Sequence, residues 1–146
     1  MIVRGICGLK AGVKNLSENI EVRSLVGRFL EHSRIFYYYN DGREDIFLSS
    51  ADWMTRNLDR RVEILFPIED EGCRERVLEV LIYQMLDTDR ARIMQGDGSY
   101  IRLRDQTPVD QRVDSQNVLM QAALQASEEV RQKSISFNRY EPLSAP

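Results

Sequence analysis

The chain has 146 residues, of which 42% are hydrophobic and 29% charged, with a formal net charge of −3. This length predicts one domain, and the apolar content is sufficient for an ordinary core without disulfide bonds. The net negative charge argues against a nucleic-acid-binding protein, and no apolar run approaches the about 20 residues that span a bilayer. The only cysteines are Cys7 and Cys73, which favours a reducing compartment and a cytoplasmic location, with peripheral contact with a membrane left open.

The first 32 residues predict a strand followed by a helix. Residues 2–9 alternate apolar with small or polar residues, as in a short buried strand, where the charge of Arg4 would need a partner. Between residues 20 and 32, apolar side chains recur at helical intervals and predict an amphipathic helix that ends near His32.

Three strands, two helices and a tail are expected in the rest of the chain. The predicted strands cover 34–39, 45–49 and 61–67, with a turn at Asn40-Asp41-Gly42 between the first two. Helices are expected over 71–86 and from Asp114 or Ser115 to Lys133, a short strand near 100–103, and a disordered or draped tail over 134–146. This order predicts an α/β domain over 1–133, a mixed sheet packed with helices.

The only histidine, His32, is followed closely by Arg34. An imidazole suits acid–base work near neutral pH or attack on phosphorus, and adjacent arginines can compensate the charge of a phosphoryl group. A second polar stretch, residues 49–61, holds Asp52, which could orient an imidazole or an arginine, and the cluster Arg56, Asp59, Arg60 and Arg61. Each stretch alone also fits a solvated, salt-bridged turn, and Trp53 between them is expected to lie in the core.

The commonest nucleotide-binding devices are missing from the sequence. It contains no Gly-x-x-x-x-Gly-Lys-Ser/Thr loop and no Asp-Phe-Gly motif. A protein with this sequence that handles a nucleoside triphosphate must therefore use another arrangement.

Three segments together resemble bacterial polyphosphate kinase, in its C-terminal, second phospholipase-D-like catalytic domain. They are Val3-Arg4-Gly5-Ile6-Cys7 with the following residues to Ile20, the run from Ser24 to Arg34, and the run Ser49-Ser50-Ala51-Asp52-Trp53-Met54-Thr55-Arg56-Asn57-Leu58-Asp59-Arg60-Arg61-Val62-Glu63. The resemblance is strongest over residues 1–90. It implies a phospholipase-D-like fold and reversible transfer of the terminal phosphate of ATP to polyphosphate.

The resemblance also implies site residues, a cofactor and partners. His32 matches the second active-site histidine of the family, and Arg4 and Arg61 match phosphate-binding positions, so that all three would contact ATP or polyphosphate. The histidine that becomes phosphorylated lies in the preceding domain, as do most ligands of the implied Mg²⁺. We therefore expect a C-terminal fragment that is inactive alone, with ATP, ADP and polyphosphate as ligands, the preceding domains of the same enzyme as partners, and a homo-oligomer at full length.

Two other functions stay open from the sequence. A homodimeric phospholipase-D-like phosphodiesterase would need a lysine two residues after the histidine and an aspartate five residues later, where this chain has Arg34 and Tyr39. A non-catalytic polyphosphate-binding or oligomerisation module would need only the arginines.

Overall fold

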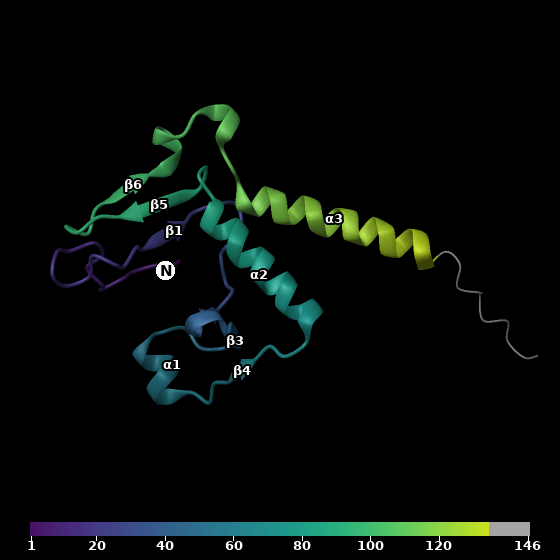
Figure 1. The fold of residues 1–146 in the computed structure, drawn as a ribbon, viewed down its shortest axis with the longest axis horizontal. Coiled ribbons are helices and arrows are strands. Elements are labelled where there is room, and N and C mark those ends of the chain that lie inside the picture. Colours follow the sequence, from purple (N-terminus) through teal and green to yellow (C-terminus); the bar gives the residue numbers. More distant parts are fainter. Residues whose placement is uncertain (135–146) are drawn as a thin grey trace, which may run out of the picture.

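The computed structural model describes residues 1–134, with side chains to Arg131, so the predicted tail lies outside the described residues apart from the backbone of Ser134. This part is a mixed α/β arrangement of two small sheets and three α-helices (Figure 1). In chain order the elements are β1 (Arg23–Leu25), β2 (Ile35–Tyr38), β3 (Asp45–Ser49), α1 (Thr55–Arg60), β4 (Leu65–Pro67), α2 (Glu71–Leu86), β5 (Ala91–Met94), β6 (Tyr100–Arg102) and α3 (Ser115–Ser134).

Each sheet has three antiparallel strands. The first has the order β1-β5-β6, and Ile2 adds a parallel bridge to Arg23 at its edge. The second has the order β2-β3-β4, and Pro67 lies on its edge strand, where the missing amide hydrogen costs no ladder bond. The chain crosses from the first sheet to the second between β1 and β2, in the segment that contains His32.

Apolar burial is concentrated beside the first sheet. Val22 is fully buried there, and Ala11 and Met94 pack with it. Partly buried side chains of Val3, Cys7 and Ile20 surround this cluster. In the second sheet Ile46 of β3 is buried. The N-terminal segment is therefore held against the first sheet by side-chain packing as well as by the bridge at Ile2.

A buried carboxylate joins both helices α2 and α3 to the first sheet. Asp87 has no exposed surface, and its Oδ1 accepts from the amides of Arg90 and Ala91 at 2.6 and 3.1 Å. Its Oδ2 accepts from the amide and the hydroxyl of Ser115 at 2.8 and 2.6 Å. Asp87 follows α2, Ala91 begins β5 and Ser115 begins α3, so one side chain fixes the corner where these elements meet (Figure 1).

Two predictions for the first 32 residues are wrong. Residues 2–9 do not form a strand beyond the bridge at Ile2, because Gly5 has a positive φ of 87° that interrupts the extended run and leaves Ile6 exposed. Residues 20–32 are not helical. They contain β1 and an irregular segment, because β1 pairs with β5, a strand that the sequence analysis missed.

The predictions for the remaining elements are largely confirmed. The three strands are β2, β3 and β4, the turn at Asn40–Gly42 is present, and α2 covers the predicted residues. A short strand, β6, lies at Tyr100–Arg102, and Asp114 caps α3 by accepting from the amide of Asn117 at 3.1 Å. The α/β class is confirmed, with the strands divided between two sheets.

Replacing Asp87 should destabilise the whole described fold. Asp87→Ala leaves the four donors of the corner without their acceptor, so we expect the free energy of unfolding to fall by about 3 kcal/mol. Urea denaturation followed by circular dichroism measures this. Asp110→Ala is the matched control, because Asp110 is exposed, and an equal loss in the two variants would contradict the role of Asp87.

Candidate functional site

Four polar side chains meet between the N-terminal segment and the loops that flank the second sheet. The Oδ1 atom of Asp52 lies 2.9 Å from Nε of Arg34 and 3.6 Å from Nη2 of Arg4. Nη2 of Arg34 lies 3.2 Å from Nε2 of His32. We call Arg4, His32, Arg34 and Asp52 the arginine–histidine cluster. It unites the two polar stretches that the sequence analysis singled out with Arg4, which precedes both.

Local backbone structure explains why Arg34 and Asp52 meet. The amide of Ser49 donates to the carbonyl of Arg34 at 3.1 Å, which extends the β2–β3 pairing by one residue. The hydroxyl of Ser49 then accepts from the amide of Ala51 at 3.0 Å and turns the chain after β3. Asn57 of α1 is buried and donates to the carbonyl of Asp52 at 3.3 Å. The position of Asp52 is thus fixed by the turn before it and by the side chain of Asn57 after it.

Arg4 reaches the cluster from the N-terminal segment, which lies beside β1. The amide of Val3 donates to the carbonyl of Arg23 at 2.8 Å, which fixes the N-terminal segment along β1. One guanidinium nitrogen of Arg4, Nη2, faces Asp52, while the other, Nη1, is buried and has no partner among the described residues. An unpaired buried donor costs free energy, so a ligand that accepts from Nη1 would recover that cost.

His32 is exposed, and Arg34 contacts both its ring and its backbone. Besides the contact with Nε2, Nη1 of Arg34 donates to the carbonyl of His32 at 3.4 Å. A guanidinium carries only donors, so the contact with the ring is a hydrogen bond when Nε2 offers its lone pair. Arg34 therefore orients the ring and presents its Nε2 side at the cluster.

The cluster carries an excess of positive charge. The hydrogen bond from Arg34, together with the Coulombic attraction of Arg34 and Arg4, outweighs burial and lowers the pKa of Asp52 below its ordinary value of 3.8. Asp52 is thus an anion near neutral pH, and two guanidiniums share one carboxylate. The remaining positive charge, with the free donor of Arg4, suits an anion such as phosphate.

The third predicted site residue, Arg61, lies apart from these contacts. Its Nη1 atom is 4.0 Å from Oε1 of Glu63, and its side chain is 61% exposed. Glu63 also accepts from the hydroxyl of Ser50, two residues before Asp52. Arg61 is therefore linked to the same loop through Glu63, but no contact among residues 1–131 joins it to the cluster.

Trp53 is not in the core, so that prediction is wrong. Its side chain is 74% exposed, although its ring stacks on Phe36 at 5.8 Å between centroids. An indole next to Asp52 is thus accessible from solvent.

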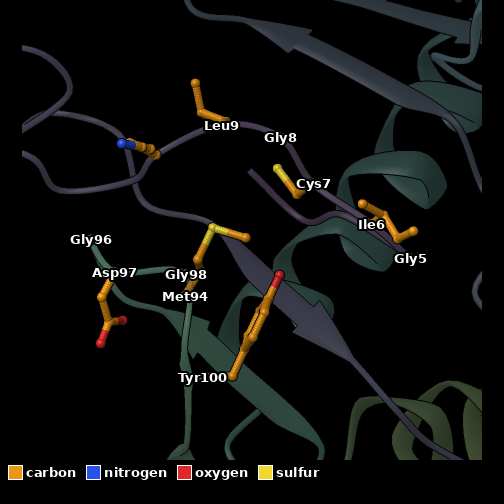
Figure 2. Close-up of a pocket in the computed structure, with 11 residues that line it drawn as sticks. Gly5, Ile6, Cys7, Gly8, Leu9, Met94, Gly96, Asp97, Gly98 and Tyr100 are labelled. Carbon is orange, nitrogen blue, oxygen red and sulfur yellow. The ribbon is translucent and has the colours of Figure 1, made fainter.

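A cavity of about 580 Å³ is lined in part by residues 5–10, which directly follow Arg4 in the chain. It lies between residues 5–10 and the end of the β5–β6 hairpin, and the side chains of Cys7, Met94 and Tyr100 point into it (Figure 2). Lys10 is the one basic residue of its lining. The cavity is more apolar than the cluster and shares no residue with it.

The described residues do not fit a magnesium site. In the part of the chain with placed side chains, no group of three or more His, Cys, Asp or Glu residues could hold a metal ion. A separate observation concerns membranes. Within the part of the chain that the structure describes, no helix is both long and apolar enough to cross one.

The family of the chain follows from its similarity to known proteins. Residues 1–116 match the family described as polyphosphate kinase C-terminal domain 2. The chain belongs to this family. It is 51% identical over 116 residues to polyphosphate kinase of Halalkalibacterium halodurans, covering 80% of this chain and 16% of that protein. It is 57% identical over 105 residues to polyphosphate kinase of Burkholderia ambifaria, covering 71% of this chain and 15% of that protein.

A solved structure shows the same fold. The crystal structure of polyphosphate kinase from Porphyromonas gingivalis superposes with a TM-score of 0.66 at 36% identity, over 78% of this chain and 17% of that one. The polyphosphate kinase resemblance is confirmed, and the match supports the phospholipase-D-like domain expected from it. The chain spans less than a fifth of the length of each of these relatives.

Stability at acid pH should depend on Asp52. Because folding lowers its pKa, Asp52 stabilises the fold above pH 3.8, and this contribution is lost as the pH falls below that value. We expect Asp52→Asn to lower the free energy of unfolding by about 1 kcal/mol at pH 7, with the difference from the unsubstituted chain shrinking below pH 3.8. Urea denaturation at pH 7, 5 and 3 measures both curves, and a difference independent of pH would contradict the assignment.

Proposed function

We propose that this chain supplies the phosphate-binding half of a polyphosphate kinase active site, which reversibly transfers the terminal phosphate of ATP to polyphosphate. The unpaired, buried Nη1 of Arg4 carries this proposal. Asp52 holds that guanidinium in place without using all of its donors. Family membership supports the identity of the anion as a phosphate chain.

The cluster suits charge compensation in phosphoryl transfer. In that reaction the bond between the terminal phosphorus and its bridging oxygen would break, ADP would leave, and the phosphorus would bond to the histidine of a preceding domain. A terminal polyphosphate oxygen would then form a bond to that phosphorus as the bond to the histidine breaks. Arg4 and Arg34 would neutralise the phosphate oxygens, while His32 would contact the phosphates and assist proton transfer. Arg61, exposed at the edge of the same loop, would bind a more distant part of the phosphate chain.

The site proposed here is incomplete within the chain. The sequence holds one histidine, whereas the resemblance implies a second, phosphorylated one in a preceding domain. We propose that the preceding domains supply that histidine and the Mg²⁺ ligands, that the full-length enzyme is a cytoplasmic homo-oligomer, and that the chain alone binds phosphate chains without transferring phosphate.

Binding of inorganic tripolyphosphate tests the site directly. We expect the chain to bind it, and Arg4→Ala to weaken binding by about tenfold, because charge-assisted hydrogen bonds to the phosphate are lost. Isothermal titration calorimetry at fixed ionic strength measures the affinity, and His32→Ala and Arg61→Ala assign the other two positions. Arg43→Ala is the control, since that side chain is 83% exposed and pairs with Asp45. Equal affinities for Arg4→Ala and Arg43→Ala would contradict the proposal.

Two activity assays distinguish this function from the alternatives. We expect the chain to form no polyphosphate from ATP and Mg²⁺, and to leave the diester bis(p-nitrophenyl) phosphate intact. Release of p-nitrophenol that disappears in His32→Ala would overturn the proposal and favour a phosphodiesterase. Polyphosphate synthesis by the chain alone would contradict the proposal that its active site is incomplete.

A further inference from the structure

The segment that leads to His32 is held by two buried glutamines. Oε1 of Gln116 accepts from the amide of Phe29 at 2.9 Å, and its Nε2 donates to the carbonyl of Phe29 at 2.7 Å. The same Nε2 donates to Oε1 of Glu31 at 2.6 Å. Nε2 of Gln84 donates to Oε2 of Glu31, also at 2.6 Å. We call Glu31, Gln84 and Gln116 the amide clamp.

The clamp substitutes for a neighbouring strand. Residues 27–33 form neither helix nor strand, so their backbone groups lack the ladder that holds β1 and β2 on either side. Gln116 satisfies both backbone groups of Phe29, as a paired strand residue would. Both glutamines are buried, with 9% of Gln116 and 6% of Gln84 exposed, so their hydrogen bonds are sheltered from competing water.

Apolar packing does not fix this segment. The side chains of Val26, Phe29 and Leu30 are 50%, 50% and 72% exposed. The position of the backbone just before His32 therefore rests on the polar contacts of the clamp.

Gly27 leaves room for the amide of Gln116. A Cβ atom added at Gly27 would lie 2.3 Å from Oε1 and 2.7 Å from Cδ of Gln116, too close for either to stay in place. The φ of Gly27 is not in the left-handed region. Alanine is therefore compatible with the backbone there and would act on the clamp alone.

We propose that Glu31, Gln84 and Gln116 are positioning residues, which set the place of His32 through the backbone that precedes it. They do not touch the arginine–histidine cluster in any contact described above. Their effect on phosphate binding rests on the proposed function, whereas their effect on the His32 ring does not. They tie the active-site segment to α2 and α3, which carry Gln84 and Gln116.

Four variants of the full chain test the clamp: Gly27→Ala, Gln116→Ala, their combination, and Gln121→Ala. Gln121 is an exposed glutamine of the same helix and serves as the control. Because His32 is the only histidine, its ring-proton resonances are identified without further assignment. They are compared at one fixed pH and well below each variant's unfolding temperature, so that a loss of stability alone does not alter them.

We expect Gly27→Ala and Gln116→Ala to shift or broaden the His32 ring resonances and to speed hydrogen exchange at the amide of Phe29. The double variant should match Gln116→Ala, because Gly27→Ala acts only by displacing that side chain. Tripolyphosphate affinity should fall about fivefold in each of these variants, and Gln121→Ala should leave all three measurements unchanged.

Unchanged His32 resonances in Gln116→Ala would overturn the proposal, and so would an additional effect of Gly27→Ala in the double variant. If the unsubstituted chain bound no tripolyphosphate, the proposed function would fail, while the resonances and hydrogen exchange would still decide on the clamp.

Discussion

The buried carboxylate of Asp87 is the constraint on which the other arrangements depend. A carboxylate without exposed surface is tolerated because four donors from three residues surround it. By fixing the start of β5 it fixes the strand to which β1 pairs, and by fixing Ser115 it places Gln116, the next residue of α3. The position of Phe29, and with it that of the backbone just before His32, thus depends on Asp87 and Gln116, which lie more than 50 residues further along the chain.

The second sheet and α2 were predictable because their signals are local. Aromatic and β-branched residues fill β2, the turn at Asn40–Gly42 carries its own conformational preference, and Asp70 caps α2 by accepting from the amide of Cys73 at 2.8 Å. Such signals need no knowledge of distant residues. The division of the strands between two sheets, by contrast, depends on pairing between strands far apart in the chain, such as β1 and β5, and the spacing of apolar residues does not reveal such pairs.

The first 32 residues could not be predicted, for the same reason. Val22 and Leu25 are buried as the helical spacing required, but they are buried by β5, which begins 66 residues after Leu25. Their three-residue spacing fits a helix as well as it fits this irregular, partly extended segment. Local periodicity therefore predicted two buried positions correctly, Val22 and Leu25, but it predicted the wrong backbone, and the other apolar residues of the expected stripe, Val26, Phe29 and Leu30, are exposed.

The contacts among the charged side chains were predictable where a charge required a partner, whereas the roles of these residues stay predictions. Arg34 and Asp52 lie at matching ends of two paired strands, so sequence reasoning could bring their stretches together, and Arg4 was recognisable as a cation that needed one. Arg61 was one of a cluster of charged residues in the sequence and was chosen from it by the resemblance, and the described contacts leave its place in the site a prediction. The amide clamp gave no sequence signal, because isolated glutamines in helices are ordinary surface residues.

The placement of the cluster between two segments far apart in the chain has a thermodynamic consequence. Arg4 belongs to the N-terminal segment along β1, whereas Arg34 and Asp52 adjoin β2 and β3, so the ion pair between Arg4 and Asp52 joins the N-terminal segment to the loop after β3. An anion that binds both guanidiniums requires these segments to stay at this relative position, and by linkage it must strengthen their association by as much as that association favours its binding. Anion binding is therefore expected to reduce the motion of the N-terminal segment relative to the second sheet.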